Sequence, residues 1–261
     1  MSQDEEIIGA GAMNRVWRVG DTIRRSRGPG SDATAALLRH LEQRGFTAAP
    51  RHLGIDECGR DVLSVLPGGP VTILAGDDQL TQVASLLRAF HDATADFVPP
   101  AGVRWRVPSR PVPAKRIIHR DVAPWNLLQT GGTITGLVDW DLAGPGRLIE
   151  DFAYMVWHFV PLHGEPMGDD TEGPPVVDRP RRLRLLCDSY GLDNRDRQTL
   201  VAEVAAMEVR QAAQVADDAL TGDPAAAGLW RGGSFTETTG RSLIWLSEHR
   251  DGLEWALRPG T

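Results

Sequence analysis

The sequence predicts an α+β protein with two lobes: residues 1–67 as a small antiparallel β-sheet with one main helix, and residues 68–261 as a larger, mostly helical lobe. Short strand-like segments separated by turn residues fill the first part of the chain. Helical periodicity dominates after Glu150. The rigid, turn-prone segment 67–70, Pro-Gly-Gly-Pro, lies between the two patterns and is suited to a link between lobes.

The N-terminal residues predict three short strands. Alternating residues at 5–8, 15–19 and 22–25 are separated by a small-residue turn at 9–12 and by a Gly-Asp turn at 20–21. The sheet is therefore expected to begin as consecutive antiparallel strands.

One helix and two further strands complete the predicted first lobe. The segment 32–44 has an apolar face with helical spacing, Ser31 is placed to cap its start, and Gly45 is placed to end it. Strands are expected near 52–55 and at 61–66.

The second lobe is predicted to open with a helix at 78–94 and a proline-rich loop at 98–113. Short apolar stretches follow, two of which form a hairpin through Gly131-Gly132. The expected strands are 117–118, 126–128 and 134–138, and the expected helices are 151–160, 181–190, 195–220 and 235–250.

Composition excludes several classes of protein. A net charge of −7 argues against a broad cationic surface for nucleic acid, and 41% hydrophobic residues indicate a globular fold. No apolar run is long enough for a membrane span, and the acidic start differs from a secretory signal, so we expect a cytoplasmic protein without a membrane partner. Cys58 and Cys187 lie far apart without a metal-binding pattern, so we expect two packed thiols.

The segment 119–126, His-Arg-Asp-Val-Ala-Pro-Trp-Asn, has the form HxDxxxxN, and an apolar strand ending in Asp139 follows it through a hairpin. Phosphoryl transfer requires a carboxylate to orient the attacking hydroxyl, and oxygen ligands for magnesium. Asp121 suits the first role, whereas Asn126 and Asp139 suit the second. Two adjacent strand ends would bring these side chains together.

These motifs resemble the aminoglycoside phosphotransferase family, the small-molecule kinase branch of the protein-kinase-like fold. The likeness covers most of the chain, including the N-terminal strands, the helix ending at 86–92, the HxDxxxxN loop and the segment 139–153. It implies that Asp121 is the catalytic base and that Asn126 and Asp139 bind Mg²⁺.

Three further residues are expected to have supporting roles, and for Asp151 the resemblance implies that role. His119 is expected to hold the catalytic loop through hydrogen bonds, and Asp151 to buttress it. Asp141 lies where the glycine of a protein kinase's Asp-Phe-Gly motif would fall, and we assign it a supporting or substrate contact. Trp125 and Trp140 are expected to pack beside the loop.

The sequence departs from the kinase pattern in its basic residues. The 28 basic residues include a single lysine, Lys115, which precedes the catalytic loop and lies in the wrong lobe to replace the third-strand lysine that holds the phosphates. Arginine can hold phosphate bidentately, so we expect Arg24 or Arg25 to do so, with Arg24 preferred because it follows Ile23.

The nucleotide site is otherwise weakly marked. The middle of the helix 32–44 has no acidic residue where the family pattern places a glutamate. The Gly9 to Ala12 turn is a weak phosphate loop. As nucleotide-binding residues we nevertheless include Gly9 and Gly11 of this turn and Val65 before the interlobe link.

Two classes of function remain open. The first is a Mg²⁺-dependent kinase that moves the γ-phosphate of ATP or GTP to a hydroxyl of a small molecule. The acidic loop 161–180 favours a cationic acceptor such as an aminoglycoside. The second is a catalytically silent relative that binds a ligand or acts as an immunity protein, as the absent lysine and glutamate suggest; a peptide-directed kinase is a further alternative.

Overall fold

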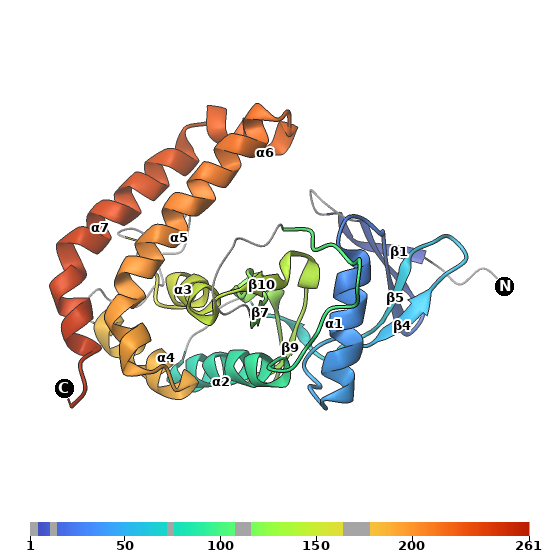
Figure 1. Ribbon diagram of the computed structural model, residues 1–261, viewed down its shortest axis with the longest axis horizontal. Helices are drawn as coiled ribbons and strands as arrows, with labels where there is room; N and C mark the ends of the chain where they lie inside the picture. Colours follow the sequence, from blue (N-terminus) through green and yellow to red (C-terminus); the bar gives the residue numbers. More distant parts are fainter. Residues whose placement is uncertain (1–4, 11–14, 72–75, 108–115, 164–177, 261) are drawn as a thin grey trace. The chain divides into compact units, whose positions relative to one another are not determined.

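The structure is a computed structural model that describes residues 5–10, 15–71, 76–107, 116–163 and 178–260 (Figure 1). Its contacts divide the chain into two compact units. The first comprises Met1–Ile73 and Leu86–Leu148, and the second comprises Leu74–Ser85 and Ile149–Thr261. A lobe boundary at residue 67 stays a prediction.

A five-stranded antiparallel sheet forms one end of the first unit, and the expected N-terminal strands are confirmed. The strands lie in the order β1-β2-β3-β5-β4. Their bounds are Glu5–Ala10 (β1), Arg15–Val19 (β2), Thr22–Arg25 (β3), His52–Ile55 (β4) and Asp61–Ser64 (β5).

Strand β1 is longer than the sequence indicates. Gly9 and Ala10 pair with β2 across a register shift after Ile7, whereas we expected both residues in a turn. A bulge lets the strand continue through these small residues by leaving one residue out of the ladder. Gly11 lies outside the described residues.

The helix of the first unit, α1, spans Ser31–Gln43, and its predicted apolar face is buried. Ser31 is the first helical residue and not the cap that we expected. Gly30 is the N-cap residue, with a φ of 92° in the left-handed region, where glycine is favoured. The Ser31 hydroxyl instead accepts a hydrogen bond from the backbone N–H of Gly28.

The remaining strands of the first unit form two small sheets. The expected hairpin is present as β8 (Leu127–Thr130) and β9 (Thr133–Leu137). Half of the predicted link, Gly69–Pro70 (β6), pairs with β8, and Gly144–Gly146 (β10) pairs with β7 (Arg116–Ile118). The sequence did not indicate β6 and β10.

A cluster of aromatic side chains forms part of the core of the first unit. Trp140 is 1% exposed, and its ring lies edge-on to Phe90 at 5.0 Å between centroids. Phe90 belongs to α2 (Asp77–Ala93), close to the predicted helix 78–94. Trp140 therefore packs beside the catalytic loop as expected, whereas Trp125 is 57% exposed.

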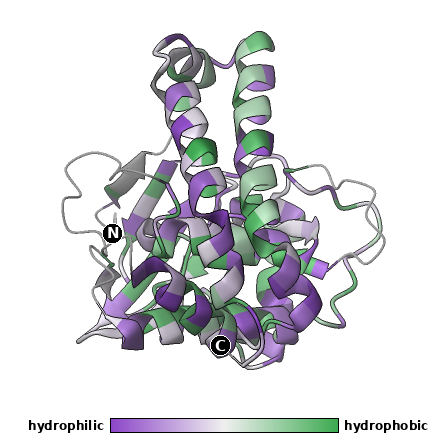
Figure 2. Cartoon of the chain, turned by 90° about the vertical axis from the view of Figure 1, so that its left-hand side faces the viewer, coloured by the Kyte–Doolittle hydropathy of each residue, from purple (hydrophilic) through white to green (hydrophobic). Residues whose placement is uncertain are grey.

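The second unit is helical. Figure 2 shows α5 and α7 side by side, with hydrophobic and hydrophilic residues mixed along both helices. No helix of the described residues is long and apolar enough to cross a membrane. The helices are α3 (Leu148–Phe159), α4 (Arg179–Tyr190), α5 (Asn194–Leu220), α6 (Pro224–Arg231) and α7 (Ser234–Ala256).

Two sequence expectations need correction here. Helix α6 was not predicted, and α7 extends six residues beyond the expected end at Arg250. Cys187 is buried as expected, but Cys58 is exposed because it lies in the turn between β4 and β5.

Candidate active site

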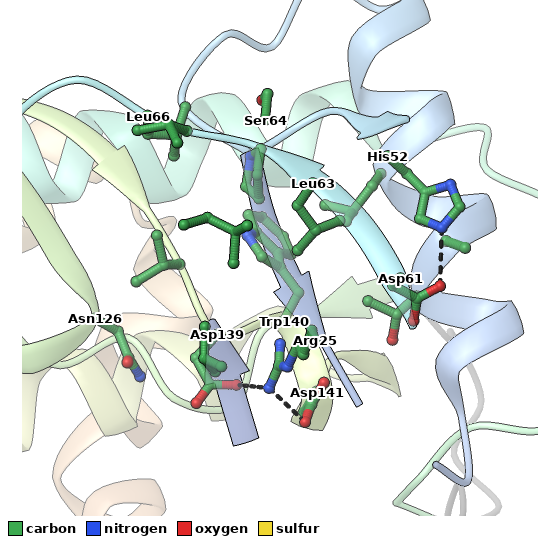
Figure 3. A pocket seen from close by; sticks show the side chains of 18 of the residues that line it. Arg25, His52, Asp61, Leu63, Ser64, Leu66, Asn126, Asp139, Trp140 and Asp141 are labelled. Atoms are coloured by element: carbon green, nitrogen blue, oxygen red, sulfur yellow. Dashed lines mark hydrogen bonds and ion pairs between the residues drawn. The ribbon is translucent and has the colours of Figure 1, made fainter. Parts of the chain in front are cut away.

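A cavity of about 400 Å³ lies within the first unit, and Figure 3 shows its interior. Strands β2, β3, β4 and β5 and helix α1 line part of it. The segment 65–68, the end of the catalytic loop with β8, and the turn 138–141 after β9 line most of the rest. Its apolar wall suits a flat, largely apolar ring system. The apolar lining residues include Val16, Ile23, Leu38, Leu63, Val65, Leu66, Leu128 and Val138.

Asn126 and Asp121 of the catalytic loop are in direct contact. The Asn126 amide nitrogen donates to the backbone oxygen of Asp121 at 2.9 Å and to its carboxylate Oδ2 at 2.8 Å. Asn126 is 5% exposed and lies in a 3₁₀ turn, Pro124–Asn126, that leads directly into β8. The loop therefore fixes the orientation of the Asp121 carboxylate.

Asp139 is joined to this loop through the hairpin. The backbone N–H of Val138 donates to the Asn126 carbonyl oxygen at 2.9 Å, which places Asn126 beside the segment that carries Asp139. Asp139 has a φ of 60° and a ψ of 67°. A left-handed non-glycine residue is uncommon and clusters at functional sites. The two magnesium-ligand candidates thus come together as the sequence spacing predicts.

His119 has a structural environment. It is fully buried, its Nδ1 accepts a hydrogen bond from the Asp121 backbone N–H at 3.3 Å, and its ring lies edge-on to Trp140 at 4.6 Å. Through these contacts His119 supports the catalytic loop.

Arg120, which sequence reasoning missed, anchors the catalytic loop from the other side. Its guanidinium donates to the backbone oxygens of Leu142 at 2.9 Å and Pro145 at 2.6 Å, and its φ is 69°. A side chain on Gly144 would approach the guanidinium to 2.9 Å. The Gly-Pro-Gly segment 144–146 was therefore the signal in the sequence that another side chain, that of Arg120, packs closely against the backbone here.

Arg25 connects β3 to the two acidic residues that follow β9. Its Nη2 lies 2.9 Å from Asp139 Oδ1 and 2.5 Å from Asp141 Oδ2 (Figure 3). Arg106 also approaches Asp141, at 3.7 Å. Burial raises the pKa of the Asp141 carboxyl, the Arg25 guanidinium opposes this rise, and the neighbouring Asp139 adds to it.

Arg24 is placed differently. Successive residues of a strand point to opposite faces of the sheet, so only one of the two arginines can face the cavity. Arg24 pairs with Asp56, at 3.3 Å, and does not line the cavity, whereas Arg25 does. Arg24, which we preferred from the sequence, therefore lies on the face of the sheet that points away from the cavity.

The side of α1 that lines the cavity is uncharged. It consists of Ser31, Thr34, Ala35 and Leu38, which agrees with the missing glutamate. The acid in this wall is Asp61 of β5, which is opposite Arg25 in the sheet register. It forms an ion pair with Arg27 and lies 3.0 Å from His52, whose other ring nitrogen lies 3.1 Å from Arg39 of α1. Sequence reasoning did not find this network.

The other predicted site residues are distributed more widely. Val65 lines the cavity, whereas Gly9 lies within β1 and is not among the lining residues. Asp151 is fully buried in the first turn of α3, in the second unit. Lys115, Gly11 and most of the acidic loop, 164–177, lie outside the described residues.

The donor set around Asp139 fits Mg²⁺, which prefers oxygen ligands and usually keeps several waters or phosphate oxygens. Asn126 and Asp139 each offer a side-chain oxygen at the same side of the cavity (Figure 3). Within the described part of the chain no cluster of three or more His, Cys, Asp or Glu side chains forms a metal site. A metal bound here would therefore depend on ligands from a nucleotide.

Comparison with known proteins places this site in a class. Residues 104–186, which contain the catalytic loop and the turn after β9, match the phosphotransferase enzyme family. The chain belongs to this family and has the kinase-like fold. Over 270 aligned residues it is 33% identical to the trifolitoxin immunity protein of Rhizobium leguminosarum bv. trifolii, covering 97% of this chain and 99% of that protein.

Solved structures show the same fold. An amicoumacin kinase in complex with AMP-PNP, Ca²⁺ and its substrate superposes with a TM-score of 0.64, 14% identity and coverage of 98% and 90% of the two chains. A choline/ethanolamine kinase family protein from Mesorhizobium loti superposes with a TM-score of 0.60 and 16% identity, and the match covers 98% of this chain and 93% of that chain. The GDP complex of wild-type aminoglycoside 2'-phosphotransferase-IIIa superposes with a TM-score of 0.52 and 14% identity, and the match covers 96% of this chain and 93% of that chain.

Proposed function

We propose that this phosphotransferase moves the γ-phosphate of ATP or GTP to a hydroxyl group of a small molecule, with Mg²⁺ as cofactor. The observation that carries the proposal is the joining of Asp121, Asn126 and Asp139 by the hydrogen bonds of the catalytic loop and hairpin, beside a cavity. Nucleotide complexes of proteins with the same fold support the choice of donor.

Each residue has a role in this chemistry. The Asp121 carboxylate accepts the proton of the acceptor hydroxyl, while the new O–P bond forms and the bond from the γ-phosphorus to the bridging oxygen of the diphosphate breaks. Asn126 keeps the carboxylate oriented through its amide nitrogen. Asn126 and Asp139 would hold Mg²⁺, which neutralises phosphate charge, and Arg25, which lines the cavity together with Arg18, can hold phosphate oxygens.

The acceptor that we propose is a hydroxylated natural product. Among proteins of this fold, one acts on amicoumacin and another is an aminoglycoside 2'-phosphotransferase. The net charge of −7 favours a cationic acceptor through long-range attraction.

Replacement of Asp121 by Asn tests the proposal. Turnover should fall by about 10²- to 10⁴-fold because the general base is lost, while binding of the Mg²⁺–nucleotide should persist. The assay measures phosphate transfer from labelled ATP or GTP to a panel of aminoglycosides and other hydroxylated metabolites. Asp21→Asn, in the exposed turn after β2, is the matched control. If the wild-type protein binds no nucleotide with Mg²⁺ at millimolar concentration, the proposal is wrong.

A second function is favoured by the likeness to a trifolitoxin immunity protein over nearly the whole chain. Such a protein protects either by phosphorylating its target or by binding it. Asp121→Asn and Asp139→Asn separate these mechanisms in cells exposed to a toxic natural product. Protection that persists in both variants would support sequestration, whereas protection that requires both carboxylates would support phosphorylation.

A further inference from the structure

The position between the Asp139 and Asp141 carboxylates is occupied by a cation of the protein itself. A single nitrogen, Arg25 Nη2, lies 2.9 Å from one carboxylate and 2.5 Å from the other. The Arg25 side chain is 14% exposed, and the Asp139 side chain is 48% exposed. The guanidinium therefore neutralises the acidic residues from the buried side, while Asp139 stays accessible from the other.

Arg25 is only partly satisfied in this arrangement. A guanidinium has five N–H donors, but the Nε of Arg25 is buried and has no hydrogen-bond partner among the described residues. A buried donor without a partner carries a free-energy cost and requires an explanation. Phosphate oxygens entering the adjacent cavity would be suitable partners, since guanidinium binds phosphate with two parallel hydrogen bonds.

We propose that Arg25 is a displaceable counter-cation: it holds Asp139 and Asp141 in the nucleotide-free protein and moves to the phosphates when a Mg²⁺–nucleotide enters. This inference rests on the proposed function. It adds that the metal and the guanidinium compete for Asp139, so that the metal alone binds weakly.

The surrounding charges permit this exchange. When Arg25 leaves Asp141, that buried carboxylate retains Arg106, which lies 3.7 Å away, and so is not left without a cation. Asp139 exchanges the guanidinium for the metal, and the guanidinium exchanges carboxylates for phosphates. If both cations stayed on Asp139, their mutual repulsion would oppose metal binding. Metal and nucleotide should therefore each strengthen the binding of the other.

The experiment measures Mn²⁺ binding in the absence of nucleotide, by electron paramagnetic resonance, for the wild-type full-length protein and two variants. Arg25→Gln removes the competing cation and should bind Mn²⁺ at least about fivefold more tightly than the wild type, the low end of couplings between sites. Arg24→Gln removes the same charge from the opposite face of the same strand and should leave the Mn²⁺ affinity unchanged.

An unchanged or weakened Mn²⁺ affinity in Arg25→Gln would overturn the inference, as would an equal gain in Arg24→Gln. Circular dichroism checks the fold of each variant, and Arg25→Ala replaces Arg25→Gln if the latter is unfolded. The proposed function is judged separately, by Mg²⁺–nucleotide binding and transfer in the wild type. If the wild type binds the nucleotide but Arg25→Gln shows no gain in Mn²⁺ affinity, only the proposed displacement of Arg25 is refuted.

Discussion

At the scale of single residues, backbone strain coincides with the chemistry. Among the described residues, Arg120 and Asp139 are the non-glycine residues with positive φ. One adjoins Asp121, and the other is a candidate metal ligand. Such conformations cost free energy and persist only where surrounding contacts enforce them. Here the contacts are the two backbone oxygens that accept hydrogen bonds from the Arg120 guanidinium, and the hairpin that ends two residues before Asp139.

Gly68 is a residue at which both backbone conformation and space require glycine. Its φ is 111°, and a side-chain carbon would lie 2.6 Å from the backbone oxygen of Gln129. Gly59 has a φ of 74° but open space around it, so Gly59→Ala isolates the conformational cost of about 1–2 kcal/mol.

We expect Gly68→Ala to lower the free energy of unfolding by about 1–3 kcal/mol more than Gly59→Ala, because it adds a steric clash. Urea denaturation of both variants measures the difference. Equal losses in the two variants would show that the backbone around Gly68 adjusts without cost.

Sequence spacing was sufficient to predict which residues of the catalytic loop and hairpin come together, because a hairpin fixes the distance between its ends. It could not choose between Arg24 and Arg25, because a shift of one residue in strand register reverses the faces. The Asp61 network was equally inaccessible, since it joins α1, β4 and β5 through contacts that only the folded sheet brings about.

At the scale of elements, the helices of the second unit enclose a carboxyl group. Glu208 of α5 is 3% exposed and accepts a hydrogen bond from the Trp157 indole N–H of α3 at 2.7 Å. Burial raises the pKa of the Glu208 carboxyl from 4.5 to about 7, and the Trp157 hydrogen bond partly opposes this. Near neutral pH, packing of α3 against α5 thus depends on a carboxyl group that is partly protonated.

The pH dependence of stability should report this group. Between pH 4.5 and about 7 the folded protein retains a proton that the unfolded chain has released, so stability falls as the pH rises. Relative to Glu208→Gln, the wild type should lose about 2–3 kcal/mol of unfolding free energy between about pH 5 and about pH 8. Urea denaturation at several pH values tests this. Parallel pH profiles would contradict it, and the exposed Glu237→Gln on α7 is the control.

Periodicity predicted the long elements better than the short ones. Helices α2, α3, α4 and α5 have enough turns for an apolar face to repeat, so each was predicted within three residues of its ends. Strands β6 and β10 have only two or three residues, and they exist because partners pair with them. Helix α6 has eight residues, too few for a clear periodic signal.

At the scale of the whole molecule, all residues that line the cavity belong to the first unit. The contacts of a bound nucleotide would therefore form with one unit, and a ligand stabilises the state that it binds.

Hydrogen exchange tests this on the intact protein. Addition of Mg²⁺ and a non-hydrolysable ATP analogue should slow amide exchange most in β2, β3, β5 and β8, which carry lining residues, and less in α5 and α7. Protection confined to α5 and α7 would place the nucleotide elsewhere. The analogue without Mg²⁺ serves as the control.

The cavity is lined by the guanidinium groups of Arg18 and Arg25, and no lysine is among the described residues that line it. Nucleotide acyl phosphates identify kinases by transferring an acyl group to a lysine amine close to the bound phosphates. Arginine stays protonated in proteins and does not act as such a nucleophile. A nucleotide acyl phosphate bound in this cavity would therefore find no lysine to acylate among the described residues that line it.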